Sequence, residues 1–144
     1  MRIEIDQSGK LEDTHKPTVV GFSNSTSKTV IILATEKQKL QKFFRNIGKP
    51  NVYRYKTFAI MIFLLLEHKH LSQIIIDTEY VGQEAVIKNY LLELFRKTRK
   101  NLLKNVIIFK QIGKKSQAHI VSYNAYRTKK ADLKICAKDI EKFV

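Results

Sequence analysis

The order in which strand-like and helix-like runs follow one another constrains the fold of this chain more than any other feature. Three runs of alternating or β-branched residues come first, and helical periodicity then takes over, interrupted by two further apolar runs. The predicted strands cover residues 2–6, 18–22, 28–34, 72–77 and 106–109. The predicted helices cover residues 35–46, 57–68, 83–97, 117–127 and 137–143, with Thr35 and Ser116 as N-caps.

This order predicts an α/β fold with a mixed sheet. Three leading strands joined by polar turns form an antiparallel meander, and the later strands, which follow helices, join it through right-handed crossovers. The simplest topology has the strand order 3-2-1-4-5, with strands 1 and 4 as parallel neighbours in the middle. We therefore expect one domain over residues 1–144, with a five-stranded mixed sheet flanked by helices.

The composition is that of a chain that can build its own core. Of 144 residues, 44% are hydrophobic, and Cys136 is the only cysteine, so neither an intramolecular disulfide nor a Cys-based zinc site is possible. The first six residues resemble a strand rather than a signal peptide, and the longest apolar run, residues 58–66, is too short to span a bilayer. We therefore expect a cytoplasmic protein without membrane association. Richness in Ile and Lys with no Trp is typical of a thermophile.

The charge of the chain points to a polyanionic partner. Lys and Arg number 27 against 13 acidic residues, which gives a formal net charge of +14. Such a charge on a small domain attracts polyanions, and nucleic acid is the commonest polyanion in a cell. The alternatives are a Lys-rich surface that is simply solvated, an acidic protein partner or a membrane surface.

Two aspartates end strands that the predicted topology makes neighbours. Asp6 ends the first strand and Asp77 ends the fourth, and adjacent strands lie about 4.8 Å apart. Two carboxylates at that distance repel unless a cation lies between them or one is protonated. Hard oxygen ligands suit Mg²⁺ or Mn²⁺, and two such ions about 3.5–4 Å apart activate water in phosphodiester cleavage. The alternative is that each aspartate only caps the turn that follows it.

A metal site built on these two aspartates needs a third ligand. His119 is the first candidate, because it lies in the first turn of the helix after the fifth strand, which should return beside the aspartates. Glu79 is a second candidate, two residues beyond Asp77. The alternative for His119 is a surface or packed histidine.

Two basic segments are candidates for contact with nucleic acid. Lys114 and Lys115 precede a predicted helix N-terminus, which is a natural phosphate site. Arg54 and Lys56 alternate with tyrosines in residues 53–56, as charged and stacking side chains do in single-strand binders. Lys10, in the turn after the first strand, completes the set. The alternatives are plain loop lysines and a loop tyrosine packed on the core.

Two short motifs resemble those of a group of uncharacterised ribonuclease H-like proteins. Residues 3–9, Ile-Glu-Ile-Asp-Gln-Ser-Gly, are similar to the first strand of that group, which reads approximately Tyr-Ile-Asp-Glu-Ser-Gly. Residues 74–77, Ile-Ile-Ile-Asp, are similar to its second motif, a hydrophobic strand that ends in Asp. The resemblance implies that Asp6 and Asp77 are metal ligands, that the fold is ribonuclease H-like, and that the protein processes nucleic acid.

The sequence departs from that group at two positions. Gln7 stands where an acidic residue is typical, and His119 stands where the group has an acid in the helix after the fifth strand. Histidine in a ligand set favours Mn²⁺ over Mg²⁺. Our leading hypothesis is therefore a metal-dependent nuclease with Asp6, Asp77 and His119 as catalytic residues. A non-catalytic nucleic-acid-binding module on the same fold is the second hypothesis, and an interaction domain for an acidic protein is the third.

Overall fold

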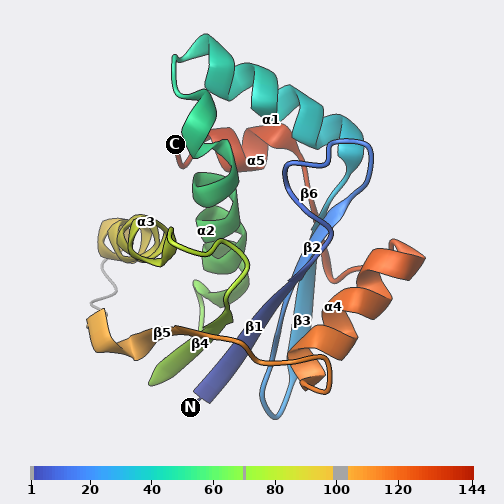
Figure 1. Cartoon of the computed structure of the whole chain (residues 1–144), viewed down its shortest axis with the longest axis vertical. Helices are drawn as coiled ribbons and strands as arrows, with labels where there is room; N and C mark the ends of the chain where they lie inside the picture. The colour runs from blue at the N-terminus through green and yellow to red at the C-terminus, as the bar shows by residue number, and fades with distance from the viewer. Residues whose placement is uncertain (1, 70, 99–103) are drawn as a thin grey trace.

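The computed structural model describes residues 2–69, 71–98 and 104–144, and its elements are shown in Figure 1. The strands are β1 (Arg2–Ser8), β2 (Thr18–Ser23), β3 (Ser27–Ile32), β4 (Gln73–Asp77), β5 (Ile107–Lys110) and β6 (Leu133–Ile135). The helices are α1 (Ala34–Asn46), α2 (Tyr53–Leu66), α3 (Glu84–Lys97), α4 (Gln117–Thr128) and α5 (Ala137–Glu141). Two short 3₁₀ turns cover Pro50–Val52 and Lys104–Val106.

The strands of the described residues form one mixed sheet in the order β5-β4-β1-β2-β3-β6. The meander β1-β2-β3 is antiparallel, whereas β4 pairs with β1, β5 with β4, and β6 with β3 in parallel. The α/β class and the mixed sheet were predicted, but the predicted count of five strands is wrong. The sixth strand is only three residues long and lies beside β3, where neither its length nor its composition distinguishes it from a loop.

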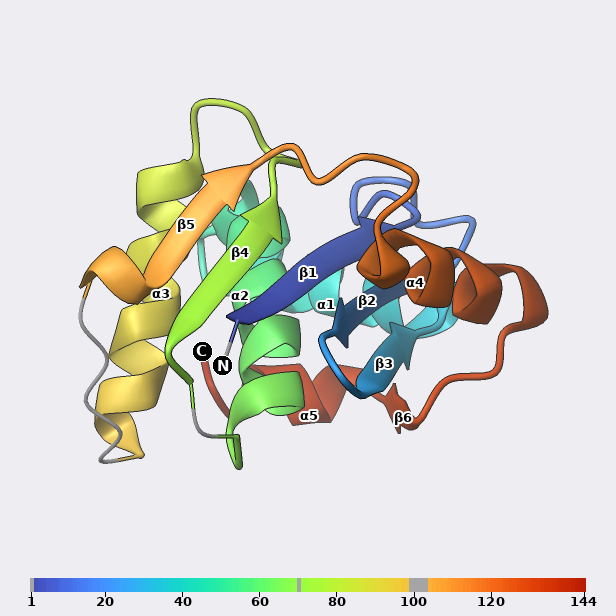
Figure 2. The same cartoon turned by 90° about the horizontal axis from the view of Figure 1, so that it is seen from below.

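Helices cover the two faces of the sheet unequally. Helix α4 packs alone on β1, β2 and β3, while α1, α2, α3 and α5 lie on the opposite side (Figure 2). The main core is on that opposite side, where most residues of α2 are buried in one cluster with isoleucines of β1 and β4, and α2 contacts the sheet at β2 and β3. Among the described residues, the face under α4 holds a small apolar cluster of Val19, Ile31 and Ala125, with Leu33, Tyr126 and Ala131 packed against it. This second face therefore has room for polar side chains.

Three local predictions have clear outcomes. Ser116 is the N-cap of α4, and its Oγ accepts a hydrogen bond from the Ala118 amide at 3.2 Å, as predicted. Thr35 is not an N-cap, because α1 begins at Ala34 and Leu33 occupies the cap position. The predicted start of the second helix at residue 57 is wrong as well, since α2 begins at Tyr53. That tyrosine is buried, and its hydroxyl donates to the Leu11 carbonyl at 2.8 Å, so tertiary packing fixes the helix start.

Helix α4 approaches the sheet closely because β2 carries a glycine at the contact. A Cβ on Gly21 would lie 3.2 Å from the Ser122 Cβ and 3.2 Å from the Thr29 Cγ2. This close approach brings the Ser122 hydroxyl to within 3.1 Å of the Ser8 hydroxyl at the end of β1. In the described part of the chain, no helix has both the length and the hydrophobicity needed to cross a bilayer.

Candidate metal centre

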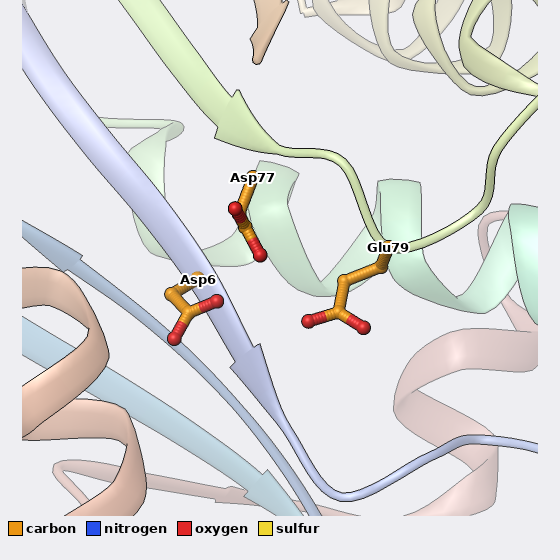
Figure 3. A group of neighbouring side chains, drawn as sticks. All are labelled: Asp6, Asp77 and Glu79. Atoms are coloured by element: carbon orange, nitrogen blue, oxygen red, sulfur yellow. The ribbon is translucent and has the colours of Figure 1, made fainter. Parts of the chain in front are cut away.

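Asp6 and Asp77 lie side by side on the face of the sheet that α4 covers. Ile5 pairs with Ile76 across the parallel β1–β4 ladder, so the two aspartates are the next residues on each strand. The side chains of Ile5 and Ile76 belong to the main core, and alternation along the strands therefore turns both carboxylates to the opposite face. The adjacency predicted from the strand order is present (Figure 3).

Glu79 completes a cluster of three carboxylates. Its side chain turns back from the loop after β4 toward the two aspartates (Figure 3). One oxygen from each of Asp6, Asp77 and Glu79 can be chosen so that all three lie within 4.8 Å of one another. Asp6 is buried, Asp77 is half-buried and Glu79 is exposed, so solvent reaches the cluster from the side of Glu79 and not from that of Asp6.

The cluster is electrostatically costly when no cation neutralises it. Burial raises the pKa of Asp6, and the neighbouring Asp77 carboxylate adds to the rise, although a hydrogen bond from His119 opposes it. The pKa of Glu79 is raised to about 7, first by desolvation of its carboxylate and then by the charges of Asp6 and Asp77. Glu79 as a whole residue is exposed, so solvent screens part of this repulsion.

His119 contacts Asp6 instead of joining the three carboxylates. Its Nδ1 lies 2.7 Å from Asp6 Oδ2, and the Ser122 hydroxyl donates to the same oxygen at 3.3 Å. An ionised carboxylate only accepts, so Nδ1 carries the proton in this contact whenever Asp6 is charged. The predicted position of His119 beside the aspartates is thus observed. The group within ligand distance, however, contains Glu79 in its place.

Backbone and side-chain hydrogen bonds hold the rest of the site. Asp77 Oδ1 accepts from the Ile112 amide at 2.9 Å, which ties the β5–α4 loop to the end of β4. Gln7 donates from Nε2 to the Gly9 carbonyl at 3.1 Å and accepts from the Tyr80 hydroxyl at 3.1 Å. Sequence reasoning missed the roles of Ile112 and Tyr80, because each contact joins segments that are far apart in the chain.

The three carboxylates open onto a cleft of about 270 Å³. The cleft is lined by Asp6, Gln7, Asp77, Thr78, Glu79, Gln111, Gly113, Lys114 and His119. Lys114 is exposed at its rim, where a cation can attract an anionic ligand toward the acids. The loop between β5 and α4 therefore supplies one wall of the cleft, and the β4–α3 loop supplies the other.

The structure separates the predicted phosphate-binding residues into two groups. Lys114 lines the cleft, and Lys115, the next residue along the chain, is exposed. The charge of Lys10 lowers the pKa of Glu79, against the larger effects that raise it.

Arg54 and Lys56 are engaged elsewhere on α2. Arg54 Nη1 lies 3.4 Å from Glu12 Oε2, and Arg54 Nη2 donates to the Tyr55 hydroxyl at 2.8 Å. Lys56 Nζ lies 4.6 Å from the centre of the Tyr90 ring on α3. Neither side chain lines the cleft, because residues 53–56 form the first turn of a packed helix.

The donor set fits a hard divalent cation. Carboxylate oxygens are the ligands that Mg²⁺ and Mn²⁺ prefer, and a cation would offset the repulsion that raises the pKa of Asp6 and Glu79. The described residues place no thiol in the group, which argues against a soft metal. Neither models of known protein families nor curated protein sequences match this chain.

Proposed function

We propose that this protein is a divalent-metal-dependent nuclease of the ribonuclease H-like superfamily, which hydrolyses phosphodiester bonds. The observation that carries the proposal is the convergence of Asp6, Asp77 and Glu79 within 4.8 Å at the carboxyl edge of the sheet. Open α/β sheets place their sites at this edge. The formal charge of +14 provides the attraction for a polyanionic substrate.

The topology supports the superfamily assignment. Read from β3 to β5, the neighbours are β3, β2, β1, β4 and β5, which is the order that a ribonuclease H-like fold would have, and β6 adds a strand beyond β3. The two aspartates stand at the ends of β1 and β4, the middle pair of that order. The likeness of residues 3–9 and 74–77 to the strand motifs of that superfamily is consistent with this assignment.

The residues of the cleft would have different roles in such a reaction. Asp6, Asp77 and Glu79 would hold Mg²⁺ or Mn²⁺, which when bound supplies Lewis-acid stabilisation of the phosphate and a more acidic water. His119 fixes the orientation of Asp6 through Nδ1, and Nε2 of the neutral imidazole is then an acceptor for a proton. Lys114 at the rim would hold a backbone phosphate of the substrate.

A cleavage assay tests the proposal. Purified protein is incubated with single-stranded, duplex, hybrid and branched oligonucleotides in Mn²⁺ or Mg²⁺. We expect metal-dependent cleavage of at least one substrate, lost in Asp77→Asn. Asparagine keeps an oxygen that can accept from Ile112, so the loop stays in place while the charge is removed. Cleavage that persists at the wild-type rate in both Asp6→Asn and Asp77→Asn would refute the site.

One observation favours a second candidate, a non-catalytic nucleic-acid-binding module. Gln7 stands where related strands carry an acid, and both ends of its amide are occupied by Gly9 and Tyr80. The cleft therefore gains no fourth carboxylate from this position. Salt-sensitive binding of nucleic acid that is indifferent to Mn²⁺, with no cleavage of any substrate, would establish this candidate over the nuclease.

A further inference from the structure

Helix α4 carries a row of rings that begins at the acid cleft. His119 and Tyr123 lie one helical turn apart, with their ring centres 6.0 Å apart and their planes only 8° from parallel. Tyr126 continues the row, 6.5 Å from Tyr123 and 23° from parallel. The first ring of the row is the one whose Nδ1 contacts Asp6, so the row extends directly from the site.

This row faces solvent at its centre and is fixed at its far end. Tyr123 is 47% exposed, which is unusual for a large ring that has a helix and a sheet beside it. Tyr126 instead packs on the backbone of Gly9, where a Cβ would lie 2.7 Å from its Cε1, and on the small cluster beneath α4. Tyr123 thus lies between two neighbouring rings of the row, and about half of its surface is exposed to solvent.

The charge around the row suits a polyanion. The Arg127 guanidinium lies 5.9 Å from the centre of the Tyr123 ring, and Arg127, Lys129 and Lys130 are all exposed. Helix α4 itself contains no acidic residue. Exposed rings flanked by cations are the means by which proteins bind unpaired bases, because every base has a face that stacks and every phosphate carries a charge.

We infer that His119, Tyr123 and Arg127 form a stacking platform for the unpaired bases of a single-stranded nucleic acid whose backbone enters the acid cleft. The inference rests on the proposed function for the identity of the ligand and specifies the strand state of the substrate. Duplex nucleic acid stacks its bases internally and offers few faces to such a row. The platform therefore selects single-stranded segments over blunt duplex.

Binding is measured without metal, so that the result is independent of cleavage. A fluorescein-labelled oligothymidylate, its oligouridylate counterpart and a blunt duplex are titrated with protein in EDTA, and anisotropy is recorded. We expect Tyr123→Ala to weaken both single strands by about 5- to 100-fold and to change duplex binding little. Tyr123→Phe should bind as wild type does, because it keeps the ring. The two single strands also show whether DNA or RNA is preferred.

Tyr90 on α3 provides a matched control. It too is a partly exposed tyrosine with a cation over its ring, but it lies away from the cleft. Tyr90→Ala should leave binding unchanged. Wild-type affinity in Tyr123→Ala, or an equal loss for duplex and single strand, would overturn the platform. A selective loss of single-strand binding without cleavage by any variant would keep the platform and reject the nuclease.

Discussion

Two regions of this protein each contain a buried ionisable side chain, Lys37 in one and Asp6 in the other, and the surroundings of the two differ. Lys37 on α1 is fully buried, and its Nζ donates to the Lys10 carbonyl at 3.0 Å, the Asp13 carbonyl at 2.6 Å and the Thr18 Oγ1 at 3.0 Å. An ammonium has three protons, so these neutral acceptors use all of them. The buried lysine thereby fastens the loop between β1 and β2 to the helix.

The acid cluster is the reverse case. Asp6 and Asp77 each have hydrogen-bond donors from α4 or from the loop before it, but Glu79 has none recorded within the described residues. The three carboxylates thus converge, and several of their oxygen lone pairs accept no hydrogen bond from the described residues. The difference indicates the role of each region. Lys37, whose ammonium protons are all hydrogen-bonded, stabilises the fold, whereas the like charges of the acid cluster are available to bind a cation.

The largest expected effect comes from removing the charge of Lys37, whose ammonium protons are all hydrogen-bonded. Lys37→Met should lower the free energy of unfolding by about 3–4 kcal/mol, because three acceptors, among them the buried Thr18 hydroxyl, lose their donor at once. Urea denaturation followed by circular dichroism measures the change. Lys39→Met is the control, since Lys39 is exposed on the same helix and its pair with Glu36 is a surface contact; the midpoint should not move. A Lys37→Met protein as stable as wild type would show that the buried bonds contribute nothing.

Lys37 also makes the free energy of unfolding depend on pH. Desolvation lowers the pKa of Lys37 to about 8, whereas in the unfolded chain it lies near 10.5. Between these values the unfolded state binds more protons, so stability rises with pH, by about 2 kcal/mol between pH 8 and 10. Burial raises the pKa of Tyr53 and Tyr80, which reverses the trend above pH 10.

Denaturation curves of wild type and Lys37→Met at several pH values isolate the contribution of the lysine. The difference between the two proteins should widen as the pH rises from 8 to 10. A constant difference across this window would mean that Lys37 keeps an ordinary pKa in the folded protein.

The smallest expected effect is a gain in stability at the acid cluster. Glu79→Gln should stabilise the metal-free protein at pH 8 by less than about 1 kcal/mol, because it removes a repelled charge that solvent already screens in part. The sign of the effect follows from the pKa of Glu79, which is raised to about 7. Above that pH the folded protein carries a negative charge on Glu79 that its surroundings destabilise. The gain should vanish near pH 4. Destabilisation by Glu79→Gln at pH 8 would mean that the glutamate is a structural partner.

The sequence was informative where a feature depends on local pattern. The order of the predicted strands and helices placed Asp6 and Asp77 at the ends of neighbouring strands, and Ser116 was identified as a cap from its position before α4. It was uninformative where long-range packing decides. Lys37 is adjacent to other polar residues and gives no sign of burial. Glu79 was the second candidate for the third ligand after His119, and the path of its loop brings it into the group in place of the histidine. The three residues of β6 are likewise strand only because β3 lies beside them.

Direct titration with Mn²⁺ is the measurement that tests the acid cluster most plainly. Isothermal calorimetry of wild type should show saturable binding that is lost in Asp77→Asn and strongly weakened in Glu79→Gln. Glu93→Gln provides the control, because Glu93 is an exposed acid on α3 that pairs with Lys97, and it should bind as wild type does. Equal Mn²⁺ binding by wild type and Asp77→Asn, or none by wild type, would contradict the assignment of this cluster as a metal centre.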